Sequence, residues 1–401
     1  MKRLKEENLG ISTVLAFILI PISGMAMDVY IPSFPHMSTD LGTSAENIKL
    51  TLTIYLVSYG LSQLFVGTLV DALGRYKINL LSLVVFILTC LGIVYSTNIY
   101  FIFLMRFIQG IAISFIVVCK RSFFIDAYTG SKRKHYTSML TMVWSTAPIM
   151  APFIGGYLQN SFGWRANFWL LAIYATIMLL LELRYSGETI VIKQKLQLKT
   201  TVENYKTLLK NADFSIGTVL LGVSYTMVMI FGMSIPFIVE EQFHLSPVYS
   251  GYCALISGVA IFLGGSLGKF TIDKPFYPKL AIANLIQLLV ALLMLISSNW
   301  ISGLWPMMVF VFIIHLFQGF TYNVYFTYCI TRFPEFAATS SGISSGGSYL
   351  IFSIVSYLIV HVINVVGQFS LSITYISCLI MIFGLLFLVK LSLKKRGVAL
   401  S

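Results

Sequence analysis

The sequence has few charged residues and lacks the motifs on which many enzymes depend. Only 10% of its 401 residues are charged, whereas a typical soluble domain carries about 25%. It contains no HExxH, no GxxxxGK[ST] and no CxxC, which excludes a zinc peptidase of that type and a P-loop ATPase. Its five cysteines fall in or beside apolar runs, so we expect buried apolar side chains and neither disulfides nor metal ligands. A soluble core is excluded because a globule must cover itself with polar surface.

Long apolar runs take the place of these features. Hydrophobic residues make up 57% of the chain and its mean hydropathy is +0.86. The runs are about 20 residues long, as a bilayer-crossing helix requires, and they have to be helical because lipid offers no partner to free backbone groups. The alternating segments of a membrane β-barrel are missing. We predict an all-α integral membrane protein with twelve transmembrane helices, over residues 11–34, 48–70, 77–97, 99–121, 137–159, 166–184, 214–238, 248–270, 278–298, 303–326, 338–362 and 368–391.

The predicted helices fall into two groups of six. The longest polar stretch, residues 186–213, separates an N-terminal half, 1–185, from a C-terminal half, 214–401, and we expect it to form a cytoplasmic central loop. The fourth helix of each half carries a polar residue three positions before Gln-Gly, as RFIQG from Arg106 and as HLFQG from His315. Two halves related in this way are typical of transporters that bind substrate between their repeats.

Basic residues lie on one side of this topology. They cluster before the first helix, after the second and fourth helices, in the central loop and in the tail, and the opposite loops hold little beyond Lys49 and Arg165. By the positive-inside rule, both termini and the central loop face the cytoplasm. The formal net charge of +12 therefore reflects topology, and its spread over many loops argues against nucleic-acid binding. The expected partner is the lipid bilayer, whose anionic headgroups basic loops contact.

Three motifs resemble those of a known family. Residues 67–77 are similar to the loop motif GxLaDrxGrkxxl of the major facilitator superfamily, with matches at Gly67, Asp71, Gly74 and Arg75 and with Ala72 where a basic residue is common. The fourth helix resembles the family's RxxQG motif at Arg106, Gln109 and Gly110. The fifth helix resembles the antiporter motif at Pro148, Pro152, Gly155 and Gly156, with Ala-Pro where Gly-Pro is usual.

The first helix narrows this resemblance. Residues 28–35, DVYIPSFP, are similar to the DMYLPALP signature of the Bcr/CflA branch of drug:proton antiporters. Arg121 and Asp126 fit the R-x4-D of that branch, although Ile125 stands where a second arginine is common. The resemblance extends over the whole chain in topology and is strongest in the first half.

The resemblance implies a major facilitator fold and a proton-coupled secondary transporter that exports small organic molecules by alternating access. It implies a monomer in the bacterial inner membrane, driven by the proton gradient with no cofactor and no metal. The alternative substrate is an endogenous metallophore or siderophore, of the staphylopine type. A membrane-embedded enzyme fits less well, because the five histidines are scattered along the chain and catalysis would need reactive groups clustered at one depth.

Asp28 and Arg106 are the leading candidates for proton coupling or substrate binding. A carboxylate within a membrane helix costs a few kcal/mol on insertion scales, so it is usually functional. Asp28 lies about 9 Å, and Arg106 about 10 Å, from the outer end of its helix, so the two side chains can share one depth. A buried carboxyl beside an arginine can exchange its proton during transport. The alternatives are a structural ion pair, or an aspartate that helps to turn the chain at Pro32.

The other polar candidates are weaker. Gln63 and Gln109 can bind a ligand or a neighbouring helix, and Tyr30 can line a cavity or simply pack. His315 occupies the position that corresponds to Arg106, and histidine is a natural titrating group, but a buried, hydrogen-bonded core histidine is the alternative.

Charged residues near the cytoplasmic ends of helices have two interpretations each. Asp71 and Arg75 are four residues apart and share a helix face. In one interpretation they keep the cytoplasmic side closed through ion pairs that form in only one state of the transport cycle. In the other they are a solvated charge pair that determines the orientation of the chain in the membrane. Lys120 and Arg121 attract an anionic substrate or anchor their helix. Glu182 is expected to be paired or to extend to the membrane surface.

The fifth helix combines proline with glycine. Pro148 and Pro152 each remove a backbone hydrogen bond and favour a bend, whereas Gly155 and Gly156 permit close helix contact. We expect this helix to pack tightly against a partner at the interface between the halves, or to pack closely without moving.

Overall fold

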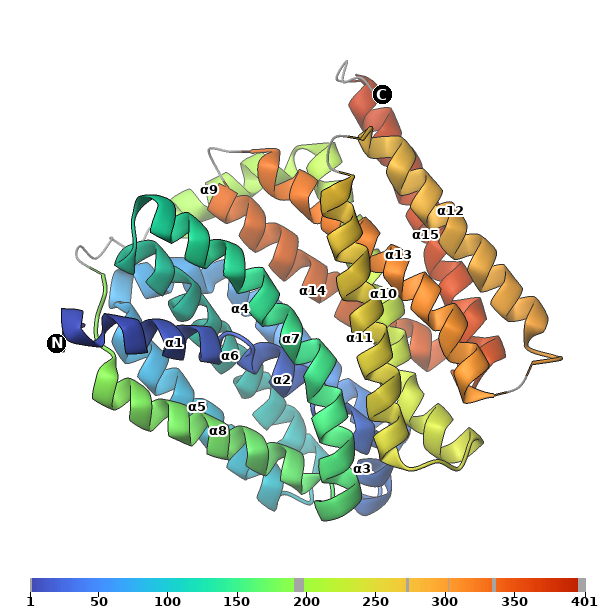
Figure 1. Cartoon of the computed structure of the whole chain (residues 1–401), viewed down its shortest axis with the longest axis horizontal. Helices are drawn as coiled ribbons and strands as arrows, with labels where there is room; N and C mark the ends of the chain where they lie inside the picture. The colour runs from blue at the N-terminus through green and yellow to red at the C-terminus, as the bar shows by residue number, and fades with distance from the viewer. Residues whose placement is uncertain (1, 191–197, 272–273, 302, 334–336, 396–401) are drawn as a thin grey trace. The chain divides into compact units, whose positions relative to one another are not determined.

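The computed structural model describes residues 2–190, 198–271, 274–301, 303–333 and 337–395. Within these ranges the regular structure is helical, apart from an isolated β-bridge between Arg3 and Glu188. The all-α prediction is confirmed. The chain divides into two compact units, Met1–Leu198 and Lys199–Ser401, which Figure 1 colours from blue to green and from green to red.

The first unit contains the segments that were predicted as the first six membrane helices. Its helices are η1 (Glu6–Asn8), α1 (Leu9–Leu19), α2 (Ile22–Asp28), η2 (Ile31–Ser33), α3 (Phe34–Asp40), α4 (Ala45–Leu73), α5 (Arg75–Tyr95), α6 (Ile99–Ala127), α7 (Gly130–Phe162) and α8 (Arg165–Tyr185).

The second unit contains the other six. Its helices are α9 (Leu198–Leu209, which begins at the boundary), α10 (Ala212–Phe237), the π-helical turn η3 (Ile238–Gln242), α11 (Pro247–Phe270), α12 (Phe276–Ser297), α13 (Leu304–Thr331), α14 (Ala337–Val362) and α15 (Gln368–Lys395).

Eleven helical stretches of the described chain are long and apolar enough to cross a bilayer. The predicted fifth span corresponds to α7, which has 33 residues and is therefore about 50 Å long. It is more polar than the others, since basic residues such as Lys132 and Arg133 occupy its first turn. Every predicted span thus coincides with a helix or, for the first span, with a series of helical segments.

The first span is broken, although the sequence predicts one helix over 11–34. Pro21 stands at the start of α2, and Pro32 and Pro35 stand in the first turns of η2 and α3. Proline lacks the N–H that a continuous helix requires, so helical segments begin again at these points. The breaks leave Asp28 at the end of α2 and Tyr30 in the turn that follows.

Helix α7 stays helical through Pro148 and Pro152 and packs against the first span. Gly155 lies so close to the Val29 carbonyl that a Cβ atom would overlap it, and a Cβ on Gly24 would lie 2.8 Å from Ala147 Cβ. The helix is therefore closely packed within the first unit, and its predicted place at the interface between the halves stays a prediction. Its partner within the first unit is the α2–η2 segment.

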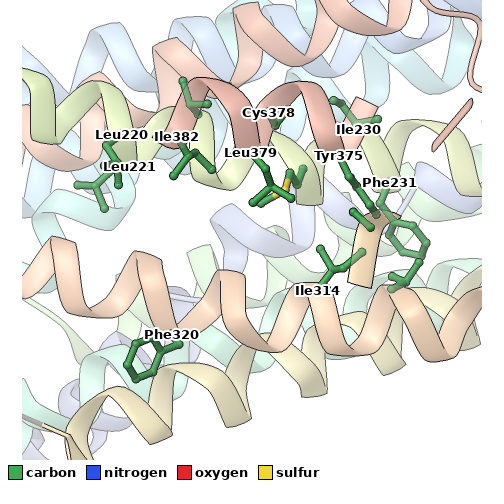
Figure 2. Close-up of a cluster of buried hydrophobic side chains, with 14 of the residues drawn as sticks. Leu220, Leu221, Ile230, Phe231, Ile314, Phe320, Tyr375, Cys378, Leu379 and Ile382 are labelled. Carbon is green, nitrogen blue, oxygen red and sulfur yellow. The ribbon is translucent and has the colours of Figure 1, made fainter. Parts of the chain in front are cut away.

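The central segment, expected to be a loop over 186–213, contains α9 and the beginning of α10. The Leu208 side chain is fully buried, and Tyr205 packs beside it in the core of the second unit. Figure 2 shows part of that core, in which α15 contributes Tyr375, Cys378, Leu379 and Ile382 and α10 contributes Leu220, Leu221, Ile230 and Phe231. All five cysteines are free and buried, as predicted.

Candidate functional site

Arg106 is the centre of a buried polar cluster in the first unit. It lies about two turns into α6, a helix that begins where the Asn98 side chain accepts hydrogen bonds from the first turn. Its side chain is fully buried. One terminal nitrogen, Nη1, donates to Ala26 O at 3.1 Å and to Gln109 Oε1 at 2.5 Å, and Nη2 donates to the Tyr30 hydroxyl at 3.2 Å. Arg106 therefore connects α6 with the broken first span.

Two tyrosine rings flank the same guanidinium group. Its carbon lies 4.5 Å from the centre of the Tyr30 ring and 4.3 Å from the centre of the Tyr55 ring. The Tyr30 hydroxyl also lies 2.9 Å from Thr51 Oγ1, and the Tyr55 hydroxyl donates to Ser23 O at 2.9 Å. Aromatic faces and neutral acceptors thus stabilise the positive charge, and no carboxylate of the described chain forms an ion pair with it.

Gln109 extends this network toward α5, because its amide nitrogen donates to Cys90 Sγ at 3.1 Å. The next residue, Gly110, lets α6 approach α4. A Cβ atom at this position would overlap the Ser58 hydroxyl and the Tyr55 carbonyl. The RxxQG spacing therefore combines two polar side chains on one helix face with the small residue that allows the neighbouring helix to come close.

Asp28 lies beside this cluster without joining it. Its side chain is buried, with 5% of the residue exposed, and no described group donates a hydrogen bond to Oδ2. Arg106 bonds instead to residues two positions before and two positions after it, Ala26 and Tyr30. The structural ion pair with Arg106 that the sequence left open is thus not formed in this structure.

The loop motif forms a second charged network at the other end of α6. Arg75 bonds to Asp71 Oδ1 at 3.0 Å through Nη2, and Nη1 forms an ion pair with Asp126. Gly74 allows this turn, because its φ of +102° lies in the region that favours glycine. Gly67 lies one turn before Asp71, with open space where a Cβ atom would lie. The predicted pair of Asp71 and Arg75 is therefore part of a network of three residues, which also includes Asp126.

Glu188 completes this network and was not predicted. Its carboxylate accepts hydrogen bonds from the backbone N–H groups of Arg75 and Tyr76, both at 3.2 Å, at the start of α5. The neighbouring Thr189 hydroxyl donates to Asp126 Oδ2 at 3.0 Å. Glu188 lies in the central polar stretch, where the sequence pattern offers no motif that would single it out.

Lys120 and Glu182 form a buried ion pair between α6 and α8. Their N···O distance is 2.6 Å, and Asn79 Nδ2 donates to the same carboxylate oxygen at 3.2 Å. The expected pairing of Glu182 is confirmed. Lys120 holds this carboxylate, which favours the anchoring interpretation over attraction of a substrate.

Sequence comparison decides the family of the chain. Residues 16–356 match the profile of the Major Facilitator Superfamily. The chain belongs to the Major Facilitator Superfamily. Its function is therefore membrane transport, as its motifs predicted. One GxSxG sequence, Gly342–Gly346, occurs inside α14, whereas hydrolases place such a serine on a strand-to-helix turn.

Two relatives and one solved structure agree with this membership in the Major Facilitator Superfamily. The chain is 28% identical to the uncharacterized MFS-type transporter YdgK of Bacillus subtilis, over 88% of this chain and 89% of the relative. It is 26% identical to a bicyclomycin resistance protein homolog of Haemophilus influenzae, over 77% of each chain, in agreement with the predicted Bcr/CflA branch. A D-xylose-proton symporter has the same fold, with a TM-score of 0.74, 13% identity and coverage of 92% and 96%.

The second unit of this major facilitator contains a counterpart of the Arg106 cluster in which a histidine takes the place of the arginine. His315 is fully buried on α13. Its Nδ1 lies 2.6 Å from Ser257 Oγ, and its Nε2 lies 3.1 Å from the Tyr375 hydroxyl. The Phe231 ring, labelled with Tyr375 in Figure 2, packs edge-on against the imidazole at 5.2 Å. Both ring nitrogens thus have hydroxyl partners, as expected of a core histidine.

Two further glutamines, Gln63 and Gln318, make no direct hydrogen bond to Arg106 or His315 in the described part of the chain. Gln63 is partly buried one turn after Tyr59 on α4 and forms a side-chain hydrogen bond with Tyr59. Gln318 corresponds to Gln109 in the repeat, and it is buried with neither amide atom hydrogen-bonded within the described ranges. Within the first unit, the structure therefore brings together Tyr30, Arg106 and Gln109 and places Asp28 beside them; His315 belongs to the second unit.

Proposed function

We propose that this protein exports small organic molecules from the cytoplasm across the bacterial inner membrane in exchange for protons. Membership in a transporter family supports alternating access. The similarity to a bicyclomycin resistance protein homolog supports a substrate of the drug type. The distribution of basic residues supports cytoplasmic termini, and we propose a monomer. Export of a metallophore has no support of its own in the relatives described above.

The unpaired carboxyl of Asp28 is the observation that carries this proposal. An ionised carboxylate at a buried position needs a counter-ion, because transfer of an isolated charge out of water is costly. Asp28 has none in the described part of the chain, and its Oδ2 lacks even a hydrogen bond. The arrangement therefore suits a neutral carboxyl, which is the proton-loaded form of a carrier.

The protonation state of Asp28 also determines which groups Arg106 binds. The charge of Arg106 is held by tyrosine rings and neutral oxygens, which bind a cation less strongly than a carboxylate does. Loss of the proton from Asp28 creates such a carboxylate two residues away from Ala26 and from Tyr30. Arg106 then gives up its hydrogen bonds to Ala26 O and Tyr30 and forms an ion pair with Asp28. This movement shifts α2 relative to α6. Proton binding restores the arrangement seen here, so the proton gradient suffices as the energy source and no cofactor is required.

The loop motif provides the other element of an alternating-access cycle. Arg75 holds Asp71 on α4 and Asp126 on α6 in this structure. We propose that this network stabilises one of the two access states and opens in the other. Its geometry supports the gating interpretation over a solvated pair, because Arg75 and Asp126 are largely buried side chains with 12% and 16% exposure.

The proposal is tested by transport into proteoliposomes with an imposed pH gradient. Bicyclomycin, chloramphenicol and the lipophilic cation ethidium serve as candidate substrates. The wild type should accumulate at least one of them against its concentration gradient. Asp28→Asn should lose this proton-driven accumulation but keep exchange of labelled for unlabelled substrate, since exchange needs no net proton movement.

Asp40→Asn is the matched control, because Asp40 belongs to the same span but pairs with Arg165 at 2.6 Å in an exposed position. It should transport as the wild type does. Undiminished proton-driven accumulation by Asp28→Asn would refute coupling through Asp28. Failure of the wild type to transport any of the three compounds would refute the drug-type substrate.

A further inference from the structure

An apolar groove runs along the second unit between α10 and α15. Its volume is about 490 Å³, and its lining includes Val219, Val223, Met381, Gly384, Phe387 and Leu388. Gly384 has no atom within 4 Å of the position that a Cβ would take, so the groove is open where the backbone of α15 is bare. Phe387 and Leu388 are 57% and 47% exposed. The groove is thus an apolar, open surface of the second unit.

The groove ends near one end of the helix pair. In a six-helix half the first and last helices run in opposite directions, so the start of α10 and the end of α15 lie at the same end of the unit (Figure 1). Val219 lies seven residues after the first residue of α10, and Leu388 lies seven residues before the last residue of α15. Both are therefore about 10 Å from that end.

Two exposed lysines stand at this end of the groove. Lys394 lies two turns beyond Phe387 on the same face of α15. Lys210 lies in the corner between α9 and α10. Ser215 Oγ donates to Leu209 O at 2.6 Å, and Ser215 stands one turn before Val219 on α10. This bond fixes the corner one turn before Val219, which lines the groove. Within the described ranges, neither lysine side chain forms a hydrogen bond or an ion pair.

Among the described residues, no carboxylate forms an ion pair with Lys210 or Lys394. Asp213, in the first turn of α10, is 1% exposed and accepts hydrogen bonds from Arg332 Nε at 3.1 Å and from the Tyr328 hydroxyl at 2.8 Å. Leu209 is 49% exposed beside Lys210. The end of the groove is thus positively charged with an apolar rim, a combination that suits the headgroup region of an anionic lipid.

We propose that this groove binds one anionic phospholipid. An acyl chain lies over Gly384 between α10 and α15, and Lys210 and Lys394 bind the headgroup phosphate. A helix from a second copy of the chain would also cover apolar surface, but its apolar face would bring no negative charge to the lysines. The charge complementarity therefore favours a lipid.

Native mass spectrometry of the delipidated protein tests this site. The protein is mixed with phosphatidylglycerol or with phosphatidylcholine of the same acyl composition. The wild type should retain one phosphatidylglycerol in preference to phosphatidylcholine. Lys210→Gln and Lys394→Gln should each reduce this preference about fivefold. Gly384→Phe, which fills the groove, should weaken retention of both lipids.

Lys132→Gln removes an exposed lysine from the first unit and should leave lipid retention unchanged. Thermal unfolding in detergent verifies that Gly384→Phe is folded, and Gly384→Ala provides a milder version if it is not. Equal retention of phosphatidylglycerol by the wild type and by folded Gly384 variants would overturn the proposal. A dimer that Gly384→Phe dissociates, with no lipid preference in the wild type, would overturn it in favour of a second copy.

Discussion

Helices α6 and α13 occupy the same place in the two units and carry the same spacing of polar residues with different chemistry. In α6, Arg106 and Gln109 bond to each other and to neighbouring helices. In α13, His315 bonds to two hydroxyl groups, and Gln318 makes no hydrogen bond to the described residues. The two helices thus share their polar positions. Of the two, only α6 carries a permanently charged side chain at the first of these positions, Arg106.

The ion pairs Lys120–Glu182 of the first unit and Arg332–Asp213 of the second differ in how deeply they are buried. Lys120 and Glu182 have side chains that are 8% and 0% exposed, whereas Arg332, which pairs with Asp213, is 23% exposed. Although some other ion pairs of the first unit are exposed, the Lys120–Glu182 pair lies in its interior. The second unit relies more on neutral hydrogen bonds and apolar packing. We infer that the first unit carries the charge chemistry of transport and that the second provides a less polar partner.

The largest expected effect concerns the interior ion pair. Glu182→Gln leaves the Lys120 charge buried without a carboxylate, so it should lower the free energy of unfolding by about 3–5 kcal/mol. Arg332→Gln should lower the free energy of unfolding by less, because Arg332 is partly exposed and Asp213 keeps its hydrogen bond from the Tyr328 hydroxyl. Chemical denaturation in detergent micelles measures both. An equal loss in the two variants would contradict the difference drawn between the units.

The double variant Lys120→Met/Glu182→Leu provides the control for this prediction. It removes both charges and restores apolar packing, so it should recover most of the stability that Glu182→Gln loses. If the double variant is as unstable as Glu182→Gln, the loss of stability is caused by altered packing around the side chains and not by an unpaired charge.

Arg106→Lys should give the next largest effect, on transport. Lysine keeps the charge but cannot reproduce the fork of hydrogen bonds to Ala26 O, Gln109 and Tyr30. Loss of one charge-assisted hydrogen bond costs about 1.5–3 kcal/mol, which corresponds to about a 10- to 100-fold lower initial rate of proton-driven transport. A rate within twofold of the wild type would show that a positive charge alone is sufficient at this position.

Replacement of the glycine that follows the motif should affect both units alike. A Cβ on Gly110 would overlap the Tyr55 carbonyl, and a Cβ on Gly319 would overlap the Ile261 carbonyl. Each alanine variant should lower the free energy of unfolding by about 1–3 kcal/mol, as overpacking does. Gly342→Ala, with nothing within 4 Å, is the control and should be neutral or slightly stabilising. A large effect in one unit only would show that the repeat geometry is not shared.

His315→Asn should have the smallest effect of this series. It removes one of two neutral hydrogen bonds, which contribute about 0.5–1.5 kcal/mol each. Proton-driven transport by this variant should have the same pH profile as the wild type. A shifted pH profile would show that His315 takes part in proton coupling and would weaken the contrast with Arg106.

Much of this architecture could be predicted because the membrane imposes it. Apolar runs of spanning length have one structural solution, so eleven of the twelve predicted segments coincide with apolar helices of that length, and the fifth coincides with the more polar α7. The motif around Arg106 was found because a guanidinium group within a span is rare and therefore conspicuous. The break at Pro21 could also have been predicted from proline chemistry, but the apolar run continues across it and suggests a single helix.

Other parts of the candidate site depend on contacts between distant segments. Glu188 is one acidic residue in a polar stretch, and only the packing of this stretch against α5 shows its partners. Cys90 and Tyr55 look like ordinary core residues, because their polar contacts come from Arg106 and Gln109 on another helix. The separation of Asp28 from Arg106 was equally hidden, since helical rise gives depth along a helix but not the direction of a side chain around it.

The β-bridge between Arg3 and Glu188 has a consequence for biosynthesis. Leu4 N donates to Glu188 O at 3.2 Å, Glu188 N donates to Lys2 O at 2.9 Å, and Lys2 Nζ bonds to two carbonyls at the end of α8. Residues 2–4 therefore find these partners only after residue 188 has been synthesised. Because this bridge joins the segment before α1 to the segment after α8, the fold of the first unit is completed only after all of its helices have been synthesised.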